Sequence, residues 1–200
     1  MSTSSEKRTQ AERSEATRTA LMDAARRLFA ERGYADVGTE EIVREAGVTR
    51  GALYHHFDGK RDLLRAVYEQ IEGEIAQDLA ERAVPGASVL ETLRLGADRF
   101  LDRCLEPEVQ RIALLDAPAV LGWEQWREIG ARYGLGLISA LLTAGIEAGE
   151  LRRQPVDPLA HALLGALDEI AMLVARADDP ARARAEAGET LTGLIEALRV

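Results

Sequence analysis

The chain has 200 residues, of which 46% are hydrophobic and 30% are charged, so it is globular rather than disordered. No uninterrupted apolar run reaches the roughly 18 to 20 residues that cross a bilayer, the N-terminus lacks the apolar core of a signal peptide, and the single Cys104 excludes an intrachain disulfide. Residues 1–60 hold ten basic and ten acidic side chains, so residues 61–200 carry the whole net charge of −9. We therefore expect a cytoplasmic protein without a membrane segment, with a nucleic-acid-facing first part and a solvated acidic remainder.

The N-terminal residues are polar, and residues 1–13 are expected to form a flexible arm. Apolar side chains then recur at helical spacing, which predicts a first helix that begins near Ser14. Gly33 follows this helix and is a natural stop.

Two short helices are predicted next, on either side of Gly47. Thr39, followed by two glutamates, is expected to cap the first of them. Thr49 is expected to cap the second, in which Leu53 and Phe57 share the buried face.

The remaining helices are marked by apolar stripes, prolines and glycines. They are expected at 60–83, at 88–105, from Pro107 with an interruption or end at Pro118, at 123–148, at 158–177 and at 180–198. Ser88 with Glu91 fits a capping box, and Asp157 and Asp179 each look like an N-cap before a proline. No segment alternates at period two for long, so the predicted fold is all-α, with about nine helices.

The stretch 39–60 has the organisation of a helix-turn-helix, whose second helix enters the DNA major groove. Arg50 lies in the first turn of that helix, and its guanidinium can bond O6 and N7 of guanine. Gly51 lets the backbone approach DNA closely, and Ala52 can contact a thymine methyl group.

Five further side chains are candidates for phosphate contacts. Tyr54 can offer its hydroxyl to a phosphate, and His55 and His56 can donate to phosphates or base edges. Lys60 can meet a phosphate through its ammonium, and Thr39 through its hydroxyl and the nearby backbone N–H groups. Adjacent histidines or a single arginine are usually only solvated, so it is the joint pattern that predicts DNA binding.

Three segments, LFAERGY (28–34), EEIVREAGVTRGALYHHF (40–57) and GKRDLL (59–64), resemble the DNA-binding domain of the TetR family of bacterial transcriptional regulators. The segment 117–137 resembles the C-terminal domain of some members more loosely. The resemblance implies a three-helix DNA-binding domain at 14–74, with its helix-turn-helix at about 38–57, and a helical ligand-binding and dimerisation domain at 75–200. The candidate DNA-binding residues are Thr39, Thr49, Arg50, Gly51, Ala52, Tyr54, His55, His56 and Lys60. Gly38 and Glu40 depart from the family pattern, and Glu40 is expected to disfavour a nearby phosphate.

A family-like C-terminal domain would enclose a pocket for an unknown small-molecule effector. The candidate lining residues are Phe100, Cys104, Leu115, Trp126, Tyr133, His161, Asp168 and Met172. Such residues are more often simple core, and no cluster argues for Cys104 as a redox sensor. His161 and Asp168, seven residues apart on one helix face, are expected to bond a ligand, another subunit or solvent.

The resemblance also implies a homodimer formed through the last two helices, about 158–198, that reads a near-palindromic operator in double-stranded DNA. We expect a repressor that a small-molecule effector releases from its operator. The alternatives are an activator of the same family, an interaction module that kept the helix-turn-helix shape without binding DNA, and an enzyme with His161 and Asp168 as acid and base. No zinc spacing, phosphate-binding loop, dinucleotide turn or nucleophile elbow occurs in the sequence, so we expect no metal, no cofactor, no catalytic residue and no enzymatic activity.

Overall fold

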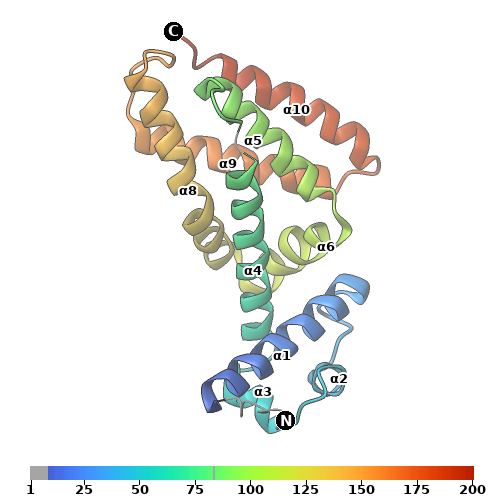
Figure 1. The fold of residues 1–200 in the computed structure, drawn as a ribbon. Coiled ribbons are helices and arrows are strands. Elements are labelled where there is room, and N and C mark those ends of the chain that lie inside the picture. Colours follow the sequence, from blue (N-terminus) through green and yellow to red (C-terminus); the bar gives the residue numbers. More distant parts are fainter. Residues whose placement is uncertain (1–8, 83) are drawn as a thin grey trace, which may run out of the picture. The chain divides into compact units, whose positions relative to one another are not determined.

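The computed structural model describes residues 9–82 and 84–200, and in this part of the chain the regular secondary structure is helical apart from one isolated bridge between Leu151 and Arg199 (Figure 1). The predicted all-α fold is confirmed. The chain forms two compact units, one ending at Val67 and the other comprising Tyr68–Val200. The division therefore lies inside one helix, α4, and earlier than the predicted boundary at residue 74.

The first unit contains three helices and the start of a fourth: α1 (Gln10–Arg32), α2 (Thr39–Glu45), α3 (Arg50–His56) and the first turns of α4 (Lys60–Glu81). The prediction that the first helix begins near Ser14 is wrong, because a capping box starts it earlier. The hydroxyl of Thr9 accepts from the backbone N–H of Glu12 at 3.3 Å, and the Glu12 carboxylate accepts from the N–H of Thr9 at 2.6 Å. The end of the expected flexible arm is thus helical, and residues 1–8 of that arm lie outside the described residues.

Each helix of the first unit buries one apolar face against the others, as the helical periodicity predicts. The buried side chains include Leu21, Ala25 and Phe29 of α1, Ile42 and Val43 of α2, Leu53 and Phe57 at α3, and Leu63, Leu64 and Val67 of α4. Removal of these surfaces from water is the main term that holds such a small unit together.

The second unit consists of the rest of α4 and seven further helical elements: α5 (Val89–Cys104), α6 (Pro107–Val109), the π-helix η1 (Gln110–Asp116), α7 (Ala117–Leu121), α8 (Trp123–Glu147), α9 (Val156–Ala175) and α10 (Pro180–Glu196). α6, η1 and α7 follow one another without a break, so the described residues form nine continuous helical rods, the predicted number. Pro118 neither interrupts nor ends its rod, which continues to Leu121. The wider π turns that precede Pro118 accommodate a residue without an N–H group.

Two of the predicted caps at the second unit's helices are present and one is absent. Ser88 accepts from the N–H of Glu91 at 3.1 Å, and Asp179 accepts from the N–H of Arg182 at 3.1 Å. Asp157 does not cap α9, because the helix already begins at Val156.

In the first unit, Thr39 is likewise not a cap. α2 is capped by Gly38, whose carbonyl accepts from the N–H groups of Glu41 and Ile42 at 3.1 and 3.2 Å. Thr39 is therefore the first residue of the helix.

The long helices α8 and α9 are apolar enough and long enough to cross a membrane by length and composition alone, with mean hydropathies of 1.4 and 1.5. The sequence analysis considered only uninterrupted apolar runs and therefore did not single out these two helices. In the structure both helices contribute to the apolar core of the second unit, for example through Leu142 and Leu164.

α10 lies beside α5 in Figure 1, and polar contacts fasten the two helices. The guanidinium of Arg184 donates to Asp102 at 2.7 Å and to the carboxylate of Asp98 at 3.1 Å. These contacts hold α10 against α5 of the same subunit, and much of the rest of α10 is exposed.

Candidate functional site

The turn between α2 and α3 has the geometry of a helix-turn-helix. Gly47 adopts a φ of +66°, which side chains rarely tolerate, and the N–H of Val48 donates to the carbonyl of Val43 at 3.0 Å. The hydroxyl of Thr49 accepts from the N–H of Ala52 at 3.2 Å, so Thr49 caps α3 as predicted. This local geometry presents the first turn of α3 outward while Leu53 is buried.

The most exposed part of α3 carries Arg50 and Tyr54. Arg50 lies 2.8 Å from the carboxylate of Glu40 in α2, and its guanidinium carbon lies 5.6 Å from the centre of the Tyr54 ring. Tyr54 is half exposed, so its ring is not part of the core. Glu40 thus has a cationic partner on the adjacent helix, which offsets the repulsion that it would exert on a phosphate.

Of the other predicted residues, Thr49, Ala52, His55 and His56 border an open groove. His55 is exposed and His56 is half-buried, with ring centres 5.0 Å apart, and Gly51 is exposed. The groove is also lined by residues of α1 that the sequence analysis did not propose as DNA contacts, namely Gln10, Ala11, Arg13, Ser14 and Thr17. The spacing of Thr9 and Glu12 is the sequence signal that would have extended α1 to this groove.

Lys60 has partners within the protein. Its ammonium donates to the carbonyls of Tyr34 and Val37, both at 2.8 Å, and lies 4.0 Å from the centre of the Tyr34 ring. Lys60 therefore anchors the loop between α1 and α2, and its contact with a phosphate stays a prediction. Thr39 lies in the first turn of α2 and is half-buried.

The second unit contains a cavity of about 110 Å³ bounded by α4, α5, η1, α8 and α9, together with Val109. Five of the eight predicted lining residues lie on its wall, namely Phe100, Cys104, Trp126, Tyr133 and Asp168. Leu115, His161 and Met172 are not among the described wall residues. Met172 is buried elsewhere in the unit and Leu115 is half-buried, so these two residues are better interpreted as packing residues.

His161 and Asp168 do not act as a pair. His161 is half exposed and its Nε2 lies 3.8 Å from Asp157 near the start of α9. Asp168, two turns further on, faces the cavity wall and accepts from the guanidinium of Arg127 in α8 at 2.9 Å. The spacing predicts that the two residues share one side of α9, but their surroundings differ: His161 meets solvent and Asp168 meets α8.

Glu72 is the wall residue that the sequence analysis missed. Glu72 lies in α4 between the buried Tyr68 and Ile75. The helical spacing of these three residues is the sequence signal that places an acidic side chain on an apolar face. Burial raises the pKa of Glu72 to about 7, although the neighbouring Tyr68 hydroxyl acts in the opposite direction. Burial likewise raises the pKa of Asp168 to about 6, against the lowering effect of Arg127.

Burial also raises the pKa of the Cys104 thiol. Because the thiolate is the reactive form, this environment keeps Cys104 protonated and unreactive. Cys104 is therefore a buried apolar wall residue, and it does not have the activated thiolate of a redox sensor.

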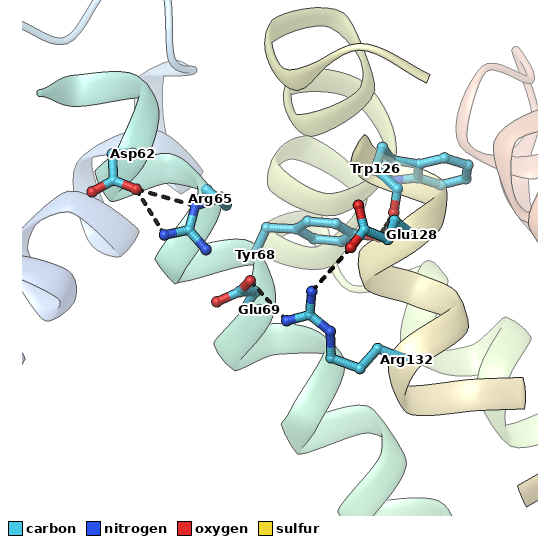
Figure 2. Close-up of polar contacts among 7 residues, drawn as sticks. All are labelled: Asp62, Arg65, Tyr68, Glu69, Trp126, Glu128 and Arg132. Atoms are coloured by element: carbon cyan, nitrogen blue, oxygen red, sulfur yellow. Dashed lines mark hydrogen bonds and ion pairs between the residues drawn. The ribbon is translucent and has the colours of Figure 1, made fainter. Parts of the chain in front are cut away.

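Polar contacts join α4 to α8 next to this cavity (Figure 2). The Tyr68 hydroxyl donates to the carbonyl of Trp126 at 3.2 Å, and the Trp126 indole N–H donates to the carbonyl of Ala113 at 2.8 Å. Arg132 of α8 lies 3.3 Å from Glu69 of α4. A displacement of α8 by a bound molecule would therefore act directly on α4.

Metal ligands are not assembled in the described part of the chain, where no group of three or more histidine, cysteine, aspartate or glutamate side chains could hold an ion. The structure thus offers two candidate sites. One is a surface around α3 with cationic and hydroxyl side chains, and the other is a mainly apolar cavity in the second unit whose wall includes two carboxylates.

Comparisons with known proteins match segments of both units. Residues 21–67 match the family model of bacterial regulatory proteins of the tetR family, and residues 90–198 match the tetracyclin repressor-like C-terminal domain. The chain is 32% identical to the transposon Tn10 TetC protein of Escherichia coli over 82% of each chain.

Solved structures extend the likeness to the whole fold. A TetR-family transcriptional regulator from Pectobacterium atrosepticum is 36% identical, with a TM-score of 0.85 over 96% of this chain and 98% of that chain. RolR in complex with resorcinol has a TM-score of 0.75 at 22% identity, over 92% of this chain and 90% of that chain, which shows a shared fold alone. Since the matched models cover both units, the chain belongs to the TetR family and is a helix-turn-helix transcriptional regulator that binds DNA.

Proposed function

We propose that the chain is a homodimeric repressor that a small-molecule effector releases from its operator in the cytoplasm. The observation that carries this proposal is the course of α4. Its first turns belong to the DNA-binding unit, and its later residues Glu72, Ile75 and Leu79 line the cavity. An effector that binds one arrangement of the cavity better than another would thereby shift the population of DNA-competent dimers.

The proposed reading head is the exposed face of α3. Arg50 reads a base through its guanidinium, while Tyr54, His55 and His56 contact phosphates or base edges, and Lys60 contributes to the positive surface near the backbone. Thr39, Thr49, Gly51 and Ala52 complete the surface that meets the duplex. The exposure of Arg50 and Tyr54 supports this proposal.

The proposed dimer forms through α9 and α10. Leu173 of α9 is 60% exposed and Leu194 of α10 is 46% exposed, and large apolar side chains at such positions favour contact with a second copy. A dimer also matches the two half-sites of a near-palindrome, about 34 to 36 Å apart.

The dimer is tested with the double variant Leu173→Glu and Leu194→Glu, with Val84→Glu, equally exposed at 46%, as the matched control. Sedimentation should give a monomer for the double variant and a dimer for the control. A double variant that remains dimeric would place the interface elsewhere.

The repressor is tested with a reporter gene behind the promoter whose DNA the protein binds. Expression should rise on deletion of the regulator, and a molecule that occupies the cavity should reproduce that rise. A fall on deletion would identify an activator instead. The similar fold of RolR, which has been crystallised with resorcinol, supports small molecules as the class of effector.

A further inference from the structure

The cavity in the second unit has an uneven distribution of polar groups. Most of its wall is apolar, and the described lining residues include no arginine or lysine. Two carboxylates, Glu72 and Asp168, line it. Only Asp168 has a cationic partner, Arg127 at 2.9 Å.

Glu72 has no such partner. Among residues 9–82 and 84–200, none forms an ion pair with it, and the polar group beside it is the Tyr68 hydroxyl, which already donates to the carbonyl of Trp126. Glu72 nevertheless retains some exposed surface although it lies in the interior of the unit. Glu72 also lines the cavity, so a molecule in the cavity can reach it.

An unpaired carboxylate in an apolar site is unfavourable when ionised, and a cation beside it removes most of that penalty. An anionic ligand would instead face two carboxylates, with the Arg127 guanidinium already engaged by Asp168. The charge of the cavity wall therefore favours cationic over anionic ligands, while the volume of the cavity limits their size.

We propose that this cavity binds a small apolar molecule with one protonated amine, whose ammonium group donates to the carboxylate of Glu72. The assignment rests on the proposed function, in which this cavity is the effector site. An engineered cavity of about 150 Å³ holds benzene, so a cavity of about 110 Å³ suits a single ring after small side-chain movements.

The titration of the site provides an independent signature. The groups that face Glu72 are Tyr68 on its own helix, Asp168 with Arg127 across the cavity, and Cys104 on α5. The pKa of Glu72 is raised to about 7, so an ammonium ligand must displace a proton from it below that pH. Its affinity should therefore fall by up to about tenfold per pH unit below 7.

The test is calorimetric binding of four molecules with the same ring to the full chain without DNA, namely benzylammonium, benzyl alcohol, toluene and benzoate. Benzylammonium should bind at least about tenfold more tightly than each of the others at pH 7.5, as expected for a charge-assisted hydrogen bond. Glu72→Gln should remove that advantage and the pH dependence, and leave toluene within about threefold. Glu81→Gln, an exposed glutamate of the same helix outside the cavity wall, is the matched control and should change neither.

A second variant tests whether the molecule enters the cavity at all. A Cβ at Gly96 on the wall would meet no atom within 4 Å, so Gly96→Leu adds bulk to the wall at a position where the first added carbon meets open space. Binding of benzylammonium should then be lost.

Equal binding of benzylammonium and benzyl alcohol, or tighter binding of benzoate, would overturn the proposal, and so would unchanged binding in Glu72→Gln or Gly96→Leu. If benzylammonium binds as expected but DNA affinity is unaffected, the ligand class stands and release of the repressor is contradicted. If neutral or anionic molecules release the DNA while benzylammonium does not bind, the repressor stands and the ligand class is contradicted.

Discussion

Glu72→Gln should make the ligand-free protein more stable at neutral and alkaline pH. The pKa of Glu72 is raised from its ordinary 4.5 to about 7, so the folded protein holds this proton more tightly than the unfolded chain. The resulting stabilisation is fully present below the unfolded pKa of 4.5 and is lost as the pH rises through 7. Glutamine resembles the protonated acid at every pH and therefore avoids the loss.

The magnitude follows from the difference between the two pKa values. At about 1.36 kcal/mol per unit, the variant should gain about 3 kcal/mol in unfolding free energy at pH 8 and less than about 1 kcal/mol at pH 5. Asp168 titrates in the same window with a pKa of about 6, but it is present in both proteins and its contribution cancels in the difference to first order.

Urea denaturation at several pH values measures this difference. Trp123 and Trp126 both lie at the start of α8 and report on unfolding of the second unit. The two proteins should converge at pH 5 and separate progressively to pH 8, at one protein concentration because dimerisation contributes to stability. A constant difference across this range would refute the reasoning that Glu72 is a buried carboxylate without a cationic partner.

Three further changes have expected results. Arg50→Ala should weaken operator binding by about 1 to 3 kcal/mol and relax the preference at one base position, and equal loss on all sequences would contradict base reading. Lys60→Met should lower the unfolding free energy by about 2 to 3 kcal/mol, because the ammonium donates to two carbonyls of the loop after α1, and a DNA-affinity loss at unchanged stability would instead assign it to a phosphate. Gly145→Ala should cost about 1 to 3 kcal/mol, because its new Cβ would lie 2.6 Å from Leu151, and unchanged thermal stability would show that Leu151 moves away freely.

The helix-turn-helix could be predicted from the sequence because its determinants are local. Gly47, Thr49 and Leu53 lie within seven residues: the first two shape the local backbone, and Leu53 buries its side chain on the inner face of α3. Helix starts were predicted less accurately, because neighbouring residues can serve as the cap: α2 is capped by Gly38, one residue before the predicted Thr39.

The cavity was only partly predictable because its wall is assembled from helices far apart in sequence. Aromatic residues such as Phe100 and Trp126 are reasonable candidates in any apolar helix, but periodicity does not distinguish a wall from filled core. Asp168 was found as a polar residue on an apolar helix, yet its partner Arg127 lies 41 residues away. Glu72 was missed because an acidic residue within an apolar stripe is ordinarily assigned to a helix margin.

The most direct test of the account is selection of genomic fragments by the purified full chain at low ionic strength without added small molecules. A near-palindromic sequence should be enriched, and Arg50→Ala should lose preference at symmetric positions of both half-sites. Retention of all fragments with equal affinity by the wild-type protein would contradict the claim that α3 reads duplex sequence.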